Sequence, residues 1–363
     1  MLRDIDIWLP GYLRRSLTRR RPPSGSAVLF CIADHFEPAQ SPGDPPELRL
    51  ERVERWIEGY ERSCAGGADS RGRAPQRTYF FPEEQYDGGL LEPLAGHCRG
   101  GFGEVEVHIH HDGDTPEEFV EKIETFKGRL ESHGLLTRRS GDGRLMYGFV
   151  HGNWALDNSL SSGRWCGLNN EITLLGDTGC YADFTMPSAP AGGQTRKVNS
   201  IYFADDDPER PKSHDTGRDL VFGGKDSGDL LLIQGPLALN WRSRKLGLLP
   251  RIENGDISAF NPPSEDRARL WIRQGISVAG REEIVFVKVH AHGLKRGSFE
   301  MFTGPEGRRL FESIESACFD EGMRLYYVSA REMANAALAL NEGTGDAVED
   351  LFDCILEKPP AGP

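Results

Sequence analysis

The stretch EVHIHHDGD, residues 106–114, places three histidines within four positions. They are His108, His110 and His111, and two aspartates follow them. Imidazole nitrogens and carboxylate oxygens are the atoms that proteins offer to Zn²⁺ and related ions. Several buried imidazoles would cost free energy if they lacked partners, so a bound ligand is the simpler explanation. We therefore expect a divalent metal here, Zn²⁺ first, with Mn²⁺, Fe²⁺, Co²⁺ or Ni²⁺ as alternatives.

Most of the other histidines occupy the same kind of position, at the end of an apolar segment. Along 104–110, three apolar side chains alternate with His108 and His110, as in a strand with one polar face. The same alternation along 282–292 places His290 and His292 on one face. Seven of the ten histidines lie at such ends, namely His35, His108, His110, His111, His151, His290 and His292. We expect these ends to meet in space.

Eight apolar segments of strand length run through the chain. They lie at 27–33, 77–81, 104–110, 145–151, 179–185, 229–234, 282–292 and 324–330. Most are followed by a loop and a segment with helical spacing. The clearest helix follows the histidines, with Thr115 as N-cap, Pro116 at the first helical position and Glu118 completing a capping box. The histidines therefore belong where a strand ends and leads into a helix.

Seven or eight strand–helix units in one chain predict an α/β fold, a single distorted (β/α)7-8 barrel with its active site at the carboxyl ends of the strands. A doubly wound open sheet is the alternative, and it would bind its ligand at the same ends. We expect a basic N-terminal arm over 1–24, the barrel over 25–342 and a C-terminal tail over 343–363. A long loop insertion near 186–226, rich in Pro, Gly and Asp, is expected to lie over the strand ends.

Charge and cysteine usage narrow the class of protein. The 363 residues carry a net charge of −13, although residues 1–23 alone carry +4. The acidic remainder predicts no nucleic-acid partner. The basic arm also holds apolar residues, so it could contact an anionic membrane surface; packing across the barrel or partial disorder is the alternative. Seven scattered cysteines and the absence of a signal-like apolar start favour a cytoplasmic protein.

Three short motifs resemble those of the polysaccharide deacetylase superfamily. ADHFEP, residues 33–38, resembles its paired-aspartate motif, with His35 where the second aspartate would stand. EVHIHH resembles its two-histidine motif, and VKVHAH, residues 287–292, resembles its late Leu-x-His motif. The motifs appear in the order of the family over residues 27–330. The resemblance implies a deacetylase-like β/α barrel over 25–342, with a metal, a neighbouring aspartate as base and a late histidine as acid.

Roles for individual residues follow from this chemistry. The expected metal ligands are His35, His108, His110 and His111. The expected catalytic residues are Asp34, His292 and His290. The expected substrate contacts are His151, Asn153, Trp154 and Asp183. A core role is equally open for His151, and Asp34 is left open as either base or ligand.

These roles describe a metal-dependent hydrolase that deacetylates an N-acetylated sugar, oligosaccharide or polysaccharide precursor. A bound metal lowers the pKa of a water molecule and polarises an acyl carbonyl. Asp34 could accept the proton of that water, and His292 or His290 could protonate the departing amine. Two alternatives remain. One is an amidohydrolase-type C–N hydrolase, which also binds metal through His-x-His; the other is a non-catalytic carbohydrate-binding barrel, which the missing second aspartate favours.

Overall fold

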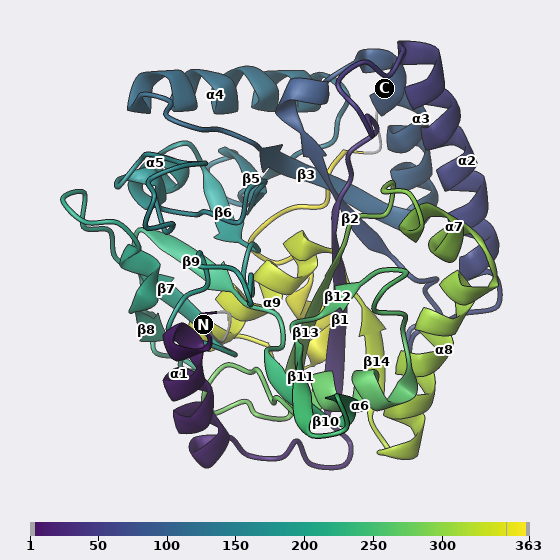
Figure 1. Cartoon of the computed structure of the whole chain (residues 1–363), viewed down its shortest axis with the longest axis vertical. Coiled ribbons are helices and arrows are strands. Elements are labelled where there is room, and N and C mark those ends of the chain that lie inside the picture. The colour runs from purple at the N-terminus through teal and green to yellow at the C-terminus, as the bar shows by residue number, and fades with distance from the viewer. Residues whose placement is uncertain (1–3, 346, 361–363) are drawn as a thin grey trace.

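A computed structural model of the chain describes residues 4–345 and 347–360. These residues form an α/β fold around a central, mostly parallel sheet of 12 strands, with helices packed on both faces (Figure 1). Residues 1–3 of the expected arm, and residues 346 and 361–363 of the expected tail, lie outside this described part. Within it, no helix combines the length and the apolar composition needed to cross a bilayer.

Strands and helices alternate along most of the chain. The strands are β1 (Ala27–His35), β2 (Arg77–Pro82), β3 (Gly103–Ile109), β4 (Thr137–Arg138), β5 (Leu145–His151), β6 (Cys180–Asp183), β7 (Ile201–Ala204), β8 (Arg218–Asp219), β9 (Leu230–Ile233), β10 (Ala238–Lys245), β11 (Leu249–Glu253), β12 (Asp256–Ile257), β13 (Ile284–Ala291) and β14 (Arg324–Tyr327). The α-helices are α1 (Ile5–Thr18), α2 (Pro46–Cys64), α3 (Gly88–His97), α4 (Pro116–Ser132), α5 (Glu171–Asp177), α6 (Glu265–Ile272), α7 (Ser298–Thr303), α8 (Pro305–Asp320) and α9 (Ala330–Asn341). Short helical turns are η1 (Glu83–Gln85), η2 (Cys98–Phe102), η3 (Ser213–Asp215) and η4 (Val348–Leu351).

All eight strands expected from the sequence are present, as β1, β2, β3, β5, β6, β9, β13 and β14. Seven of them form a continuous parallel array in the order β13-β1-β2-β3-β5-β6-β9. The eighth, β14, pairs with Ala27–Phe30 of β1, whereas β2 pairs with Ala33–His35 on the same edge. Strand β14 therefore occupies a wedge where β1 and β2 diverge.

The strand pairing does not close into a ring within the described residues, so the expected barrel is not shown. The row of hydrogen-bonded strands begins at β12 and ends at β8, and these two strands do not pair with each other. Strand β7 runs antiparallel to β9, and β8 runs antiparallel to β7. Strands β7 and β8 lie inside the segment 186–226, which we expected to be a loop insertion. The end of the sheet beyond β9 is thus formed by antiparallel strands instead of further strand–helix units.

Alternate residues of β1 pack against different helical layers. Phe30 and Ile32 belong to an apolar layer shared with α2, α3, α4 and α8. Leu29 and Cys31 belong to a second layer that contains α9. Helix α9 is rich in alanine and almost wholly buried, and a capping box formed by Ser329 and Glu332 fixes its start. The histidines of the candidate site lie on the α9 side, beyond Ala33.

The N-terminal arm is a packed helix in the described residues. In α1, Trp8 and Tyr12 are buried against Ala189, Val198 and Leu237. Of the two expectations for the arm, packing across the fold is therefore confirmed for α1. Its opposite face remains exposed to solvent.

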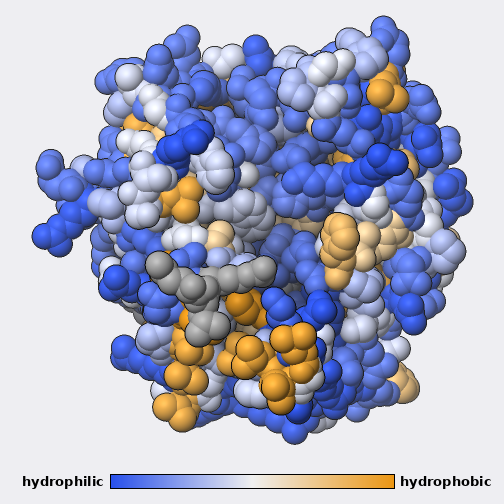
Figure 2. Space-filling view, viewed as in Figure 1, coloured by the Kyte–Doolittle hydropathy of each residue, from blue (hydrophilic) through white to orange (hydrophobic). Residues whose placement is uncertain are grey.

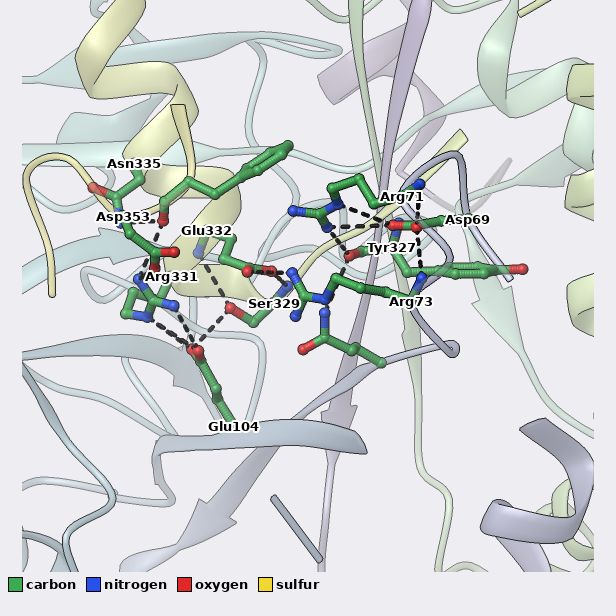
Figure 3. Close-up of polar contacts among 12 residues, drawn as sticks. Asp69, Arg71, Arg73, Glu104, Tyr327, Ser329, Arg331, Glu332, Asn335 and Asp353 are labelled. Atoms are coloured by element: carbon green, nitrogen blue, oxygen red, sulfur yellow. Dashed lines mark hydrogen bonds and ion pairs between the residues drawn. The ribbon is translucent and has the colours of Figure 1, made fainter. Parts of the chain in front are cut away.

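A buried polar network ties the C-terminal segment to the sheet (Figure 3). The guanidinium of Arg331 donates to Glu104 of β3 at 2.8 Å and to the carbonyl oxygen of Leu356 at 2.9 Å. Ser329 donates to the same carboxylate at 2.8 Å. Asn335 donates to the carbonyl oxygen of Phe352 and accepts from the amide of Leu356. Residues 352–356 of the expected tail are therefore fixed against α9.

Candidate metal centre

Five side chains from three strand ends meet at the carboxyl edge of the sheet, and we call them the central cluster. They are His35, Glu37, His108, His110 and His292. His35 ends β1, the next two histidines lie on and just after β3, and His292 follows β13. These strands are neighbours in the sheet, so their ends bring distant parts of the chain together. Two overlapping groups of three, both containing Glu37, have ligand atoms within 4.8 Å of one another.

The carboxylate of Glu37 links the two histidines of β3. Its Oε1 atom lies 3.6 Å from Nε2 of His108 and 3.6 Å from Nε2 of His110. Two ligand atoms bound to one tetrahedral Zn²⁺ at about 2.1 Å lie about 3.4 Å apart. The carboxylate of Glu37 therefore lies at about ligand spacing from each histidine, and all three ligand atoms lie within 4.8 Å of one another.

Glu84 orients His110 for such a role. Oε1 of Glu84 lies 2.8 Å from Nδ1 of His110, so the ring donates its Nδ1–H to the carboxylate. In the neutral ring Nε2 then carries no proton and faces Glu37. A carboxylate behind a histidine in this way is the usual support of a metal-binding imidazole. In the described part of the chain, neither ring nitrogen of buried His108 has a hydrogen-bond partner. An unpartnered buried imidazole is costly unless a ligand engages it.

The protonation states of Glu37 and of three of the four histidines suit a metal. The fourth, His110, has a raised pKa, because the hydrogen bond and charge of Glu84 outweigh its burial, so a metal would have to displace a proton from this ring. Burial, followed by the charges of neighbouring histidines, holds the pKa of His35 well below its usual value. Burial also lowers the pKa of His108, and it lowers that of His292 to about 3. Burial alone would raise the pKa of Glu37, but the neighbouring imidazole of His108 brings it down to about 2. Neutral imidazoles beside an ionised carboxylate are the forms that bind a divalent ion.

His35 lies between two rings. It stacks on His292 with centroids 4.5 Å apart and on Trp154 with centroids 4.7 Å apart. Trp154 is partly exposed and also meets His290 edge-on at 4.9 Å. The partly exposed indole therefore forms one wall of the cluster, where a ligand from solvent could contact it.

Asp34 lies outside the central cluster, in contrast to the expected arrangement. It alternates with His35 along β1, so its side chain points to the helical layer of α2 instead. There it accepts from the guanidinium of buried Arg77 at 2.6 Å and from the amide of Gly293 at 2.7 Å. Both carboxylate oxygens are thus engaged, and the second contact fixes the backbone directly after His292.

A second group of four buried side chains, the Glu171 cluster, lies beside the first. It consists of His111, His151, Cys166 and Glu171. His111 was expected to bind the metal together with His108 and His110. As the residue next to His110, it points to the opposite side and lies in this second group instead. His151 was expected to contact substrate, but its side chain is completely buried. The rings of these two histidines lie 4.8 Å apart.

Hydrogen bonds already satisfy much of the Glu171 cluster. Glu171 accepts from the amide of Asp157 at 2.6 Å, and its oxygens lie 3.2 Å from Nε2 of His111 and 3.2 Å from Sγ of Cys166. Nδ1 of His151 accepts the amide of Asn153 at 3.2 Å, so its proton belongs on Nε2, which faces Glu171. That proton lies where a metal would have to bind. The Glu171 cluster is therefore a buried carboxylate surrounded by hydrogen-bond donors.

The Glu171 cluster also shapes the loop that carries Trp154. Trp154, Asp157 and Asn158 all have positive φ angles, between 49° and 58°. Such angles cost non-glycine residues about 1 kcal/mol each and persist only where neighbouring contacts enforce them. The bonds from this loop to His151 and Glu171 are such contacts. Four buried residues thus place the indole over His35.

The remaining expected site residues lie near the central cluster but are engaged elsewhere. His290 is buried against Trp154, and the side-chain amide of Asn153 donates to the carbonyl oxygen of His111. Asp183 is 1% exposed and accepts from both the amide and the hydroxyl of Thr185. Burial raises the pKa of Asp183 to about 7.

Three carboxylates of these clusters were not foreseen. Glu37 shares the strand parity of His35, so extending the alternation by one step would have found it. Glu84 lies in a short helical turn after β2, and Glu171 begins α5. Neither position carries a pattern in the sequence that separates it from an ordinary surface acid. Comparison with known proteins adds no further assignment, because no protein-family model and no curated protein matches the chain.

Proposed function

We propose that this protein is a metal-dependent hydrolase that deacetylates an N-acetylated sugar, oligosaccharide or polysaccharide precursor. One observation carries the proposal. Glu84 holds His110 in the tautomer that directs a free nitrogen toward Glu37, and His108 directs its own unpartnered nitrogen there. Two imidazoles and a carboxylate are a donor set of catalytic zinc sites, which keep a position open for water or substrate.

In this proposal Glu37, His108 and His110 bind the metal, with Zn²⁺ as the first choice and Mn²⁺, Fe²⁺, Co²⁺ or Ni²⁺ as alternatives. His35 completes the ligand set or lines the open position, since its buried Nδ1 has no hydrogen-bond partner among the described residues. The Glu171 cluster has a structural role, because the proton on His151 opposes a cation there.

A divalent ion in this position supplies a water of lowered pKa and a Lewis acid for the acyl oxygen. His292 is partly exposed beside the proposed metal ligands, so its imidazole would be the group to accept the proton that an attacking water gives up. The resulting imidazolium then donates that proton to the nitrogen of the breaking C–N bond, which leaves as an amine. Asp34 holds the backbone at Gly293 and so positions His292.

The substrate class rests on Trp154 and on the resemblance in sequence. A partly exposed indole beside the metal ligands offers a flat apolar surface on which a sugar ring can stack. The motifs ADHFEP, EVHIHH and VKVHAH resemble those of polysaccharide deacetylases, and their histidines include four of the five members of the central cluster. We also propose that the strands form a (β/α) barrel and that the protein is cytoplasmic. All seven cysteines are free, as expected in a reducing compartment.

Metal analysis of the purified protein tests the proposal first. We expect about one equivalent of bound metal after incubation with zinc, and a loss of about tenfold or more in affinity for His110→Ala. Cys166→Ser is the matched control, since it removes a donor from the Glu171 cluster only. Acetate release from N-acetylated chitooligosaccharides should require the metal and should fall with the same His110 variant.

Two outcomes would contradict the proposal. A wild-type protein that takes up neither zinc nor manganese has no metal centre. A metal that is lost in Cys166→Ser but kept in His110→Ala would belong to the Glu171 cluster, and the assignment of ligands would be wrong.

A carbohydrate-binding protein without catalysis is the second candidate. The pairing of Asp34 with Arg77 favours it, because the carboxylate expected to act as base is engaged. Saccharide binding without acetate release, in a metal-loaded protein, would select this candidate.

A further inference from the structure

Leucines and a tryptophan lie exposed on two neighbouring elements, together with arginines and a lysine. The elements are α1 and the hairpin formed by β10 and β11. The exposed apolar residues are Leu13, Leu17, Trp241, Leu246, Leu248 and Leu249. The exposed cations are Arg14, Arg20, Arg242, Arg244, Lys245 and Arg251. We call this surface the hairpin–arm face.

The hairpin–arm face is continuous across its two elements. The hydroxyl of Tyr12 in α1 accepts the amide of Leu239 in β10 at 3.5 Å. Leu9 and Ile252 pack against the same small apolar cluster from the two sides. Hydrophobic atoms gather along the lower edge of Figure 2, where Figure 1 places α1 and the hairpin. These contacts hold α1 against the base of the hairpin.

Three of the exposed leucines lie at the tip of the hairpin or at the end of α1, where no other part of the described chain covers them. Leu246 is 88% exposed and Leu248 is 77% exposed, both in the turn between β10 and β11. Leu17, also 88% exposed, lies in the last turn of α1. A monomeric protein rarely gathers large exposed apolar side chains on one face without a partner for them.

Charge is distributed unevenly between this face and the rest of the molecule. Residues 4–21 and residues 238–253 each carry a net charge of +3, so the remainder of the chain carries −19. Beside α1 a cleft of about 660 Å³ is lined by Arg14, Arg15, Arg196 and Lys197. The last two are paired with Asp215 and Asp219, whereas the ion pairs of the described residues leave the first two without a carboxylate. The hairpin–arm face is positive on an acidic protein.

We propose that the hairpin–arm face docks on the surface of a membrane rich in anionic lipids. Leucine side chains would enter the boundary between headgroups and acyl chains, Trp241 would lie at that boundary, and the arginines would meet lipid phosphates. A second copy of the chain is a poor occupant, because two positive faces would repel each other. A nucleic acid would engage the cations but leave the leucines in water. An anionic bilayer satisfies both kinds of side chain.

Docking would place the candidate metal centre close to the bilayer. The hairpin begins shortly after β9 and returns at Gly255, whose carbonyl oxygen accepts the amide of His290. Eight residues of β10 at about 3.3 Å each separate its base from its tip by about 25 Å. The site would therefore lie within reach of a substrate whose saccharide is attached to a membrane lipid. That substrate class rests on the proposed function, whereas the docking itself does not.

Vesicle binding tests the docking directly. The intact protein should sediment with vesicles of phosphatidylcholine containing about a third phosphatidylglycerol, and bind pure phosphatidylcholine about tenfold more weakly. Two separate double variants, Leu246→Ser with Leu248→Ser and Arg244→Glu with Lys245→Glu, should each weaken binding to the anionic vesicles by about tenfold. Both pairs are exposed, and melting temperatures close to that of the wild type would show that the fold is kept.

The matched control carries Leu48→Ser with Arg62→Glu, on the exposed side of α2, far from α1 in Figure 1. It should bind anionic vesicles like the wild type. No binding of the wild type to anionic vesicles would overturn the proposal, and so would equal binding by the hairpin variants. A wild-type dimer that dissociates when Leu246 and Leu248 are replaced, without vesicle binding, would assign the face to self-association. If the wild-type protein binds anionic vesicles but releases no acetate, the proposed function would be wrong and the proposed docking would stand.

Discussion

The tautomer of His110 decides what the central cluster can bind. If its proton were on Nε2, the ring would repel a cation from the side of Glu37. Glu84 removes that ambiguity, since a carboxylate at 2.8 Å from Nδ1 takes the proton on that side. A residue that contacts no metal and no substrate thus governs the donor set.

Replacement of Glu84 by alanine should weaken metal binding by about tenfold to a hundredfold, because the imidazole loses both its orientation and its polarisation. Competition with a chromogenic chelator measures the affinity. Glu83→Ala is the control, because Glu83 pairs with Arg129 instead. Equal affinities in the two variants would show that Glu84 does not orient the ligand.

Asp183 predicts a pH dependence of stability. Its pKa is raised by burial from 3.8 to about 7 in the folded protein. The folded state therefore keeps a proton that the unfolded chain has lost, and this contribution to stability fades as pH rises from about 4 to about 7, by up to about 1.4 kcal/mol per pH unit. Asp183→Asn should reduce the slope over that interval; the rest of the slope comes from Glu106 and Asp157, whose pKa values burial raises to about 8.

Urea unfolding of both proteins at several pH values measures this difference, with a chelator present so that metal release adds nothing. Parallel curves for the wild type and Asp183→Asn would mean that the carboxyl group titrates normally in the fold.

Among the elements, β3 and α9 are joined by a buried ion pair. Arg331 is 1% exposed and meets Glu104 through two nitrogens (Figure 3). Arg331→Met should lower the free energy of unfolding by about 3–5 kcal/mol, because Glu104 would be left buried without its cation. Chemical denaturation measures the change.

Glu104→Gln with Arg331→Met tests the cause, since the double variant no longer buries a charge. It should recover part of the stability lost in the single variant. A double variant less stable than Arg331→Met would show that packing and the bonds to residues 352–356, and not the unpaired charge, dominate.

The strands show how far the sequence could predict the fold. Apolar runs located eight parallel strands but missed the two-residue β12, and alternation along β3 correctly placed His108 and His110 on one face. The antiparallel strand β10, with the sequence ALNWRSRK, escaped notice because it is largely solvent-exposed and lacks an apolar face. Strand β7, with the sequence IYFA, is buried and apolar but only four residues long, and it lies in a segment rich in Pro, Gly and Asp. The insertion of β14 between β1 and β2 is a property of pairing over long distances, which no local pattern contains.

The same limit applies to the candidate site. Strand parity separates Asp34 from His35 and would have separated His111 from His110, because adjacent residues of a strand point to opposite faces. Partners supplied by loops and helix starts could not be predicted, since Glu84 and Glu171 meet the histidines only after the loops have folded.

At the scale of the whole molecule, the proposed docking face and the proposed metal centre are joined by one hairpin. Gly255 and β12, which directly follow the hairpin, are bonded to β13 at His290, and the tip of the hairpin carries exposed leucines. An acidic body with one positive face would be oriented by the field of an anionic bilayer before contact. Higher salt should therefore slow association more than it alters the docked state.

The position of β1 also has a consequence for the birth of the protein on the ribosome. Strand β1 is buried along its whole length, yet its partner β13 is made some 250 residues later. Until then a nascent chain exposes one edge of an apolar strand, a template on which other unfinished chains can assemble. Slower or cooler expression, and chaperones that shield such edges, should raise the yield of folded protein more than any change at its surface.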